Sequence, residues 1–206
     1  MKTCAMASNW ARLLILFVAA VASTACATDG DAPAAMLRAA ITETLAIAYP
    51  ENGSPAPDTI AGKVRPILNR AMDLESITRR AIGPGWKQFT AAERARAVEL
   101  FSALMVRTYS GRFTSGSRPK IDFKPTVALA SERWEVPARI YRDGSSYEVL
   151  FRIEIRPGGP RIYDIVAEGV SFVANYRAQF DALFQKGGVD AVLRALETKQ
   201  PASTGR

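Results

Sequence analysis

An α+β fold, in which helices cover a curved antiparallel sheet, is the class that the sequence predicts. Apolar residues recur at helical spacing over residues 36–113, alternate with polar residues from Lys120 to Ala167, and return to helical spacing from Ser171 onward. Helices, then strands, then helices are typical of domains in which the helices segregate to one face of an antiparallel sheet. The length of 206 residues suits one such domain.

The first 27 residues have the layout of an export signal. Lys2 and Arg12 precede an uncharged apolar run, Leu13–Ala22, and small residues follow as far as Ala27. The run is too short to span a bilayer as a helix. Cleavage after Ala27 would release a soluble chain into the periplasm, which is the interpretation adopted here. Cleavage before Cys26 would instead produce a lipoprotein, and this alternative stays open.

The amino-acid composition of the chain narrows the classes of function that it can have. The chain has 27 basic and 20 acidic residues, and loss of Lys2 and Arg12 with the signal would leave 25 against 20. In an exported protein this balance favours contact with acidic membrane surfaces or protein patches, not with nucleic acid. The chain has no histidine. Histidine-dependent triads and the commonest metal ligand are therefore excluded, and we expect neither an enzyme nor a cofactor.

The N-terminal half is expected to form helices. The first runs from Met36 to Tyr49 and is closed by Pro50. The second begins at Asp58, and Pro66 is expected to end or kink it, because a ring nitrogen cannot donate the intrahelical hydrogen bond.

Two further helices have clear start signals. Asp73 is the expected N-cap of a helix that ends before the Gly83–Gly85 break. Thr90 and Glu93 form a capping box for the longest helix of the chain. One stripe of that helix is apolar and must be covered; it contains Val98, Phe101, Leu104, Met105, Tyr109 and Phe113.

The middle of the chain is expected to form about four antiparallel strands with one wet and one dry face. Residues 134–140 and 146–156 alternate between apolar and polar, and Asp143-Gly144 between them is a strong hairpin turn. Arg161–Ala167 is a third strand. Ile121–Leu129 is a weaker one, interrupted by a proline and therefore expected at an edge.

The C-terminal part is expected to be helical. Ser171 can cap a helix that carries Phe172 and Tyr176, and Gly187-Gly188 separates it from a last helical segment. The sequence therefore divides into a signal peptide at 1–27, a single α+β domain at 28–198 and a disordered tail at 199–206.

Three sequence blocks resemble the MlaC, or toluene-tolerance, family of periplasmic phospholipid-binding proteins. Tyr163–Phe180 is a short strand that turns at Glu168-Gly169 into an amphipathic helix, and this block is similar to the family signature. Lys186–Leu196 is similar to the closing pattern of the family, and Ile82–Arg94 provides a block further upstream.

The resemblance implies a cone-like domain with an internal apolar cavity that takes acyl chains, with the headgroup near the mouth. It also implies an auxiliary component of an Mla-type ABC lipid transport system. Such a component would shuttle lipid between an outer-membrane lipoprotein of the MlaA type and the MCE-domain component of an inner-membrane ABC transporter, and so maintain outer-membrane lipid asymmetry. A hopanoid or other apolar lipid is an alternative cargo, because an apolar wall does not identify its hydrocarbon.

The candidate cavity wall comes from the long helix, the central strands and the signature block. Periodicity alone predicts a filled core equally well. The candidate lipid-binding residues are Phe101, Met105, Tyr109, Trp134, Val136, Ile140, Val149, Phe151, Ile153, Tyr163, Val170, Phe172, Tyr176 and Phe180.

The opposite sheet face carries a candidate docking surface, and two other functions remain open. The docking residues are Arg133, Arg139, Arg152 and Arg156. One alternative is a structural or docking domain with a solid core. The other is an enzyme that uses Tyr163, Asp164 and Glu168 in an apolar pocket, although structural roles are expected for both acids and for the cap at Ser171. Which side of the 162–167 strand faces inward is ambiguous.

Overall fold

The computed structural model describes residues 31–53, 55–113 and 116–198, and for residue 31 and residues 108–113 it describes the backbone alone. The predicted signal peptide, Cys26 and the predicted tail lie outside these residues. The elements in chain order are α1 (Asp31–Ala48), α2 (Pro57–Ala71), α3 (Leu74–Ile82), the 3₁₀ helix η1 (Gly83–Gln88), α4 (Ala91–Phe113), β1 (Lys120–Phe123), β2 (Val127–Ala130), β3 (Arg133–Arg142), β4 (Ser145–Arg156), β5 (Gly159–Ala167), β6 (Val170–Ser171) and α5 (Phe172–Thr198).

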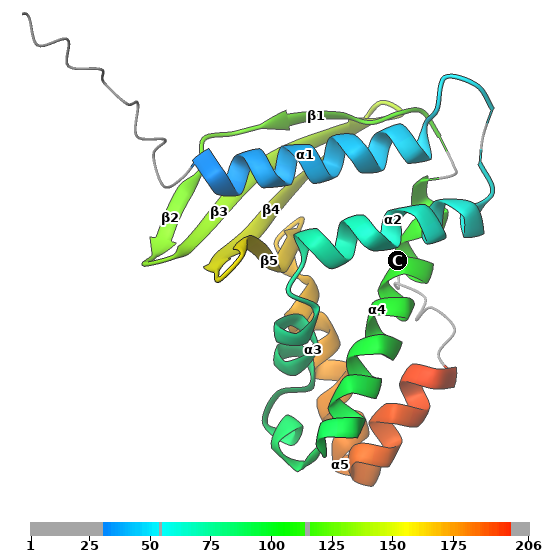
Figure 1. Cartoon of the computed structure of the whole chain (residues 1–206), viewed down its shortest axis with the longest axis vertical. Helices are drawn as coiled ribbons and strands as arrows, with labels where there is room; N and C mark the ends of the chain where they lie inside the picture. Colours follow the sequence, from blue (N-terminus) through cyan, green and yellow to red (C-terminus); the bar gives the residue numbers. More distant parts are fainter. Residues whose placement is uncertain (1–30, 54, 114–115, 199–206) are drawn as a thin grey trace, which may run out of the picture.

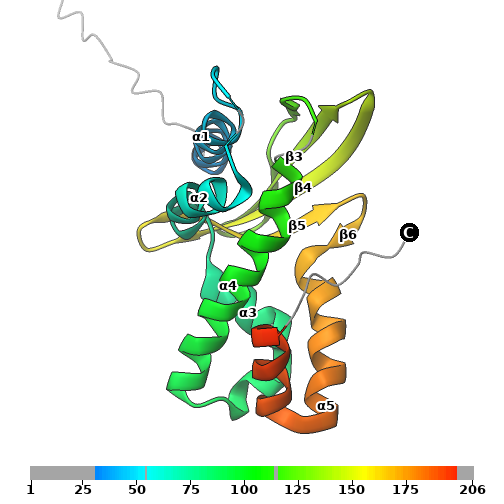
Figure 2. The ribbon, with the colours of Figure 1, turned by 90° about the vertical axis from the view of Figure 1, so that its right-hand side faces the viewer.

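The predicted α+β class is confirmed. The strands form one antiparallel sheet in the order β1-β3-β4-β5-β6, with β2 also paired to β3. The sheet has six strands, because the edge segment is split around Pro125 into β1 and β2 and because Val170 and Ser171 add β6. Figure 1 shows α1 and α2 lying across one side of the sheet, while α4 and α5 run side by side away from it. Figure 2 shows the same arrangement from the side.

The helix starts predicted at Asp73 and Thr90 are confirmed, whereas the first helix begins at Asp31, five residues before the predicted Met36. The Ser76 N–H donates to Asp73 Oδ1 at 2.9 Å, as an N-cap requires. At the start of α4 the Thr90 N–H donates to Glu93 Oε2 at 2.7 Å, and the Glu93 N–H donates back to Thr90 Oγ1 at 3.3 Å. The hydrogen bond from the Thr90 N–H lowers the pKa of Glu93. Local chemistry therefore sets where these helices begin.

Pro66 does not end its helix, so that expectation is corrected in part. Helix α2 continues through Pro66 to Ala71. Ile67 and Ala71, which follow the proline, are both buried against neighbouring elements. Burial of this face offsets the one intrahelical hydrogen bond that the proline ring removes. Within the described residues, no helix is both long enough and apolar enough to cross a bilayer.

Gly83 and Gly85 join two distant sequence blocks. Gly83 has φ +73°, and a Cβ atom there would lie 2.1 Å from Arg177 Cζ in α5. A Cβ atom on Gly85 would lie 2.8 Å from the Phe184 ring. Arg177 donates to the Arg80 carbonyl oxygen at 3.2 Å and pairs with Asp181 at 3.0 Å. The upstream block thus packs against α5 through these glycines, and Arg177 of the signature block is one of the two contacts.

Strand β5 contains a bulge, and the bulge determines which of its side chains face the inside of the fold. Phe151 lies opposite Ile165, but Ile153 lies opposite Ile162, so the pairing slips by one residue between them. Ile162 and Ile165 therefore face the same side of the sheet although they are three positions apart. Tyr163, next to the slip, has its ring under the guanidinium of Arg80 at 4.5 Å. Neither simple alternation holds for this strand.

Candidate functional site

One face of the sheet, here called the inner face, is apolar along most of its length. The alternating residues of β3, β4 and β5 pair directly across it, which groups them into rows. From one end of the sheet to the other the rows are Trp134 with Ile153 and Ile162, then Val136 with Phe151 and Ile165, then Ala138 with Val149 and Ala167, then Ile140 with Tyr147, and last Arg142 with Ser145.

Exposure increases from the row of Val136 toward the β3–β4 hairpin tip. Val136 and Ile153 are 0% exposed, and Val149 and Phe151 are nearly as buried. Tyr147, further along, is 47% exposed, and Val170, which pairs with Ala167 at the sheet edge, is 61% exposed. The inner face is therefore sealed at the end near β5 and α3, and it opens to solvent toward the β3–β4 hairpin tip. We call this open end the mouth.

Helices α4 and α5 are joined by aromatic side chains. The Phe101 ring contacts Phe172, Tyr176 and Phe180 at centroid distances of 5.8, 4.9 and 5.3 Å. Edge-on and offset ring pairs of this kind add to the stabilisation from burial. The cluster is continuous with the inner face, because these residues and Val136, Val149 and Phe151 belong to one hydrophobic core.

The structure gathers most of the predicted wall residues around this core. Phe101, Met105, Val136, Val149, Phe151, Ile153, Tyr176 and Phe180 are buried in it, and Ile140 and Phe172 pack against it. Trp134 is half-buried in the sealed row, and Val170 is exposed at the β6 edge of the sheet, in the row of Ala138 and Val149. Tyr109 is in α4, but its side chain lies outside the described ones. Tyr163 faces the opposite side of the sheet, where it contacts Arg80, and so leaves the wall.

Asp164 is the buried polar centre of the signature block. Its Oδ2 accepts from the Ser171 hydroxyl at 2.7 Å and its Oδ1 accepts from the Val173 N–H at 3.1 Å. Arg152 Nη1 lies 3.4 Å from Oδ2. Ser171 in turn accepts from the Ala174 N–H at 3.0 Å and so caps α5 as predicted. These bonds fix the start of α5 against the sheet, and they are structural.

Glu168 and Gly169 form the turn that leads into β6. Their φ angles are +49° and +78°, which suits a two-residue hairpin and explains the glycine. Glu168 Oε1 accepts from the Glu148 N–H of the neighbouring strand. Tyr163, Asp164 and Glu168, which the enzyme alternative would use, are thus each engaged in structural contacts.

The four arginines of the candidate docking surface lie on the outer face and are paired with acids. Arg133 pairs with Glu154 at 3.0 Å, Arg152 with Glu135 at 3.3 Å, and Arg139 with Glu148. The pairing raises the pKa of Arg139.

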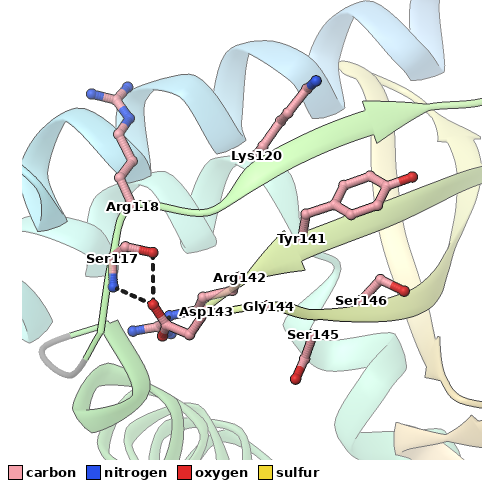
Figure 3. A pocket seen from close by; sticks show the side chains of 9 residues that line it. All are labelled: Ser117, Arg118, Lys120, Tyr141, Arg142, Asp143, Gly144, Ser145 and Ser146. Carbon is pink, nitrogen blue, oxygen red and sulfur yellow. Dashed lines mark hydrogen bonds and ion pairs between the residues drawn. The ribbon is translucent and has the colours of Figure 1, made fainter.

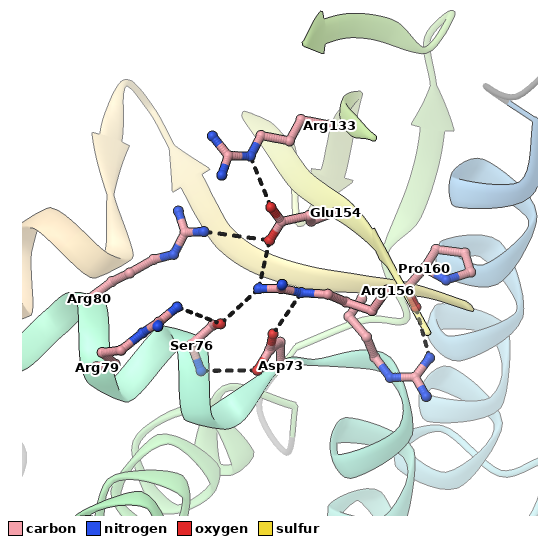
Figure 4. A network of polar contacts seen from close by, with 9 residues as sticks. Asp73, Ser76, Arg79, Arg80, Arg133, Glu154, Arg156 and Pro160 are labelled. Carbon is pink, nitrogen blue, oxygen red and sulfur yellow. Dashed lines mark hydrogen bonds and ion pairs between the residues drawn. The ribbon is translucent and has the colours of Figure 1, made fainter. Parts of the chain in front are cut away.

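Arg156 belongs to a larger network that connects the sheet to α3. Its guanidinium lies 2.8 Å from Glu154 and 3.3 Å from Asp73, and Arg80 of α3 lies 3.5 Å from Glu154 (Figure 4). This end of the outer face is therefore partly covered by α3, and its ion pairs connect the sheet to α3.

The structure also shows a pocket that sequence reasoning missed. It has a volume of about 410 Å³ and lies between the loop after α4 and the tip of the β3–β4 hairpin (Figure 3). Its lining consists of Ser117, Arg118, Lys120, Tyr141, Arg142, Asp143, Gly144, Ser145 and Ser146. The Asp143-Gly144 turn was the only signal for this region, and it indicated a hairpin without a site.

Hydrogen bonds hold the pocket together. The Ser117 hydroxyl donates to Asp143 Oδ1 at 2.8 Å, and the Ser117 N–H donates to the same oxygen at 3.1 Å. These two bonds lower the pKa of Asp143. The ionised carboxylate ties the loop after α4 to the hairpin.

Comparisons with known proteins were made for the whole chain. The family model described as MlaC protein matches residues 38–198. The crystal structure of a phospholipid-binding protein from Ralstonia solanacearum in complex with a phospholipid has a TM-score of 0.72 and 25% sequence identity to this chain, and the match covers 79% of this chain and 93% of that one. A search among curated proteins finds no match.

Proposed function

Because this chain belongs to the MlaC protein family, we propose that it is a periplasmic carrier that binds phospholipid acyl chains along the inner face of its sheet. The family match extends from α1 to the end of α5 and so includes the whole described domain except the first turns. A similar fold in a protein that was crystallised with a phospholipid supports the same cargo. We infer a binding and transport role, not catalysis.

The observation that carries this proposal is the apolar inner face that runs from a sealed end to an open mouth. Water-exposed acyl chains cost about 0.8 kcal/mol per methylene, which comes to about 20 kcal/mol for two long chains. An apolar surface removes that cost without directional bonds, so an acceptor with a similar surface can compete for the lipid. Acyl chains that enter at the mouth would slide between the sheet and the helices that cover it.

The direct test is to analyse what the purified mature chain carries. We expect native mass spectrometry and solvent extraction to find phospholipid bound to residues 28–206, and we expect the protein to take phospholipid from vesicles. A hopanoid or another apolar lipid in the extract would keep the carrier and change its cargo. Protein that carries no lipid and takes none from vesicles would contradict the proposal and favour a domain with a solid core.

Val149→Trp is expected to lower phospholipid binding about tenfold, because the indole ring would occupy the path between the mouth and the sealed rows. Val149 is buried on the inner face, one row inside Tyr147. The measurement is the amount of labelled phospholipid taken from vesicles, with thermal unfolding followed in parallel.

Val127→Trp is the matched control, since Val127 pairs with Glu135 and lies 47% exposed at the sheet edge. It should bind lipid as the wild type does. If Val149→Trp binds normally, or if it unfolds without any change in lipid bound per folded molecule, the inner face is not the binding surface.

We further propose that the carrier shuttles between two membrane complexes, one with an outer-membrane lipoprotein of the MlaA type and one with an inner-membrane MCE-domain ring. The outer-face arginines supply the docking surface in this proposal. They lie on the sheet face opposite the lipid path, so docking and lipid binding use separate side chains.

Arg139→Glu is expected to slow lipid transfer to partner complexes several-fold while the lipid that remains bound after purification is unchanged. The substitution replaces the partner of Glu148 with a second carboxylate. The two carboxylates repel each other, and both repel an acidic partner surface. Transfer between proteoliposomes with purified partners measures the effect, and Arg65→Glu on the exposed side of α2 is the control. Equal losses of transfer and retention would show that the two faces do not divide these tasks.

A further inference from the structure

The pocket at the β3–β4 hairpin tip lies where the apolar inner face ends. We propose that this pocket, with Arg142 as its central cation, binds the phosphate of a glycerophospholipid whose acyl chains lie along the inner face. The inference rests on the proposed function and adds a headgroup site to it.

Position is the first argument. Arg142 and Ser145 form the row that follows Ile140 and Tyr147, so the polar row directly succeeds the last apolar one. Strand residues rise about 3.3 Å each, and an acyl chain in one leaflet spans about 15 Å, or about four to five residues. A chain whose phosphate lies at Arg142 therefore ends between the rows of Ala138 and Val136. Both rows are buried, with Ala138 4% exposed and Val136 0% exposed.

The chemistry of the lining is the second argument. Three cationic side chains, Arg118, Lys120 and Arg142, line the pocket beside one carboxylate, Asp143. The other lining side chains that can donate are the hydroxyls of Tyr141, Ser145 and Ser146, because the Ser117 hydroxyl already donates to Asp143. A phosphodiester only accepts hydrogen bonds and carries one negative charge, so a donor-rich pocket with a positive balance suits it.

Arg142 is held in place before any ligand arrives. Its side chain is 20% exposed and its Nε lies 3.5 Å from Asp143 Oδ2. Gly116 packs against it so closely that a Cβ atom there would lie 2.9 Å from Arg142 Nη2 and 2.2 Å from Asp143 Oδ2. A guanidinium that is already positioned loses little side-chain freedom when it binds an anion, and its planar fork matches phosphate oxygens.

Arg118 and Lys120 serve a different purpose from Arg142. Figure 3 shows their side chains extending away from the hairpin, while Arg142 and Asp143 lie together beside Ser117. Arg118 is exposed, and Lys120 begins the edge strand β1. They raise the local positive potential around the pocket, and Arg142 provides the directed contact. A single directed contact orients the lipid and still permits its release.

The experiment compares two ligands with the same acyl chains, one with a phosphate and one without. Labelled phosphatidylglycerol and labelled diacylglycerol are offered in neutral vesicles to wild-type protein, Arg142→Gln, Ser145→Glu and the control Arg65→Gln. We expect the wild type to prefer the phospholipid by about tenfold. Arg142→Gln and Ser145→Glu should remove most of that preference and leave diacylglycerol uptake unchanged, and Arg65→Gln should behave as wild type.

Ser145→Glu keeps the inference testable if Arg142→Gln does not fold, because Ser145 is exposed and its replacement places a charge without opening the core. Thermal unfolding by circular dichroism identifies such a failure. Equal uptake of both lipids by the wild type would overturn the headgroup site and leave the carrier proposal intact. Uptake of neither lipid would overturn both.

Inorganic phosphate distinguishes a lipid headgroup from a free anion. If the pocket serves the lipid, millimolar phosphate should reduce the wild-type preference for phosphatidylglycerol and have no effect on Arg142→Gln. A second outcome would overturn the inference. The ³¹P resonance of inorganic phosphate would broaden when wild-type protein is added but not when Arg142→Gln is added, and the wild type would show no preference between the two lipids. The pocket would then be assigned to a free anion.

Discussion

Asp164→Ala is expected to lower the free energy of unfolding by about 3 to 4 kcal/mol. The substitution removes the acceptor for the Ser171 hydroxyl and the Val173 N–H, and it leaves Arg152 without one of its two carboxylate partners. Loss of a helix cap costs about 1 kcal/mol, and a donor left without an acceptor costs about 1 to 3 kcal/mol when buried, so these two half-buried donors lie toward the lower figure. Arg152 is about one-third exposed, so water offsets part of its loss.

Urea denaturation of the mature protein measures this effect. Asp164→Asn keeps the Oδ1 acceptor and should lose about half as much. Asp190→Ala, on the exposed side of α5, is the matched control and should stay within about 0.5 kcal/mol of wild type. A loss below about 1 kcal/mol for Asp164→Ala would show that the bonds around it do not hold α5 to the sheet.

Phe101→Ala is expected to cost about 4 kcal/mol, because it removes a fully buried ring between two helices. The ring contacts Tyr176 and Phe180 of α5 edge-on, and its removal would leave a cavity that these neighbours cannot fill without leaving their own positions. Differential scanning calorimetry gives the change in stability.

Phe101→Leu is the matched variant for Phe101. It retains most of the volume and should cost about 1.5 kcal/mol or less. Should both variants lose the same small amount, the interface between α4 and α5 is loosely packed, and the aromatic cluster is not what holds the two helices together.

Local signals in the sequence were sufficient for most of the fold. Thr90 and Glu93 start α4, Asp73 starts α3 and Asp143-Gly144 turns the hairpin, and each acts on neighbours within a few positions. Pro66 shows where local reasoning fails. The penalty of a proline was predicted correctly, but the buried face around Ile67 that offsets it depends on other elements.

The candidate site was predicted to the extent that it follows strand alternation. Val149, Phe151 and Ile153 face the core because side chains alternate along β4. Tyr163 was misplaced because the bulge in β5 shifts it to the outer face, and a bulge leaves no mark in an apolar strand. The tip pocket could not be predicted, since Ser117 and Asp143 are far apart in the sequence and meet only after folding.

The two edge strands of the sheet determine how readily molecules of this protein can associate through their sheets at high concentration. On one side the backbone of the edge is divided between β1 and β2 of four residues each, with Pro125 between them, and on the other side β6 is two residues long. An intruding strand from a neighbouring molecule would find few consecutive N–H and C=O groups to pair with, and none from the proline nitrogen. The edges of the sheet are thereby protected against pairing with a neighbouring molecule.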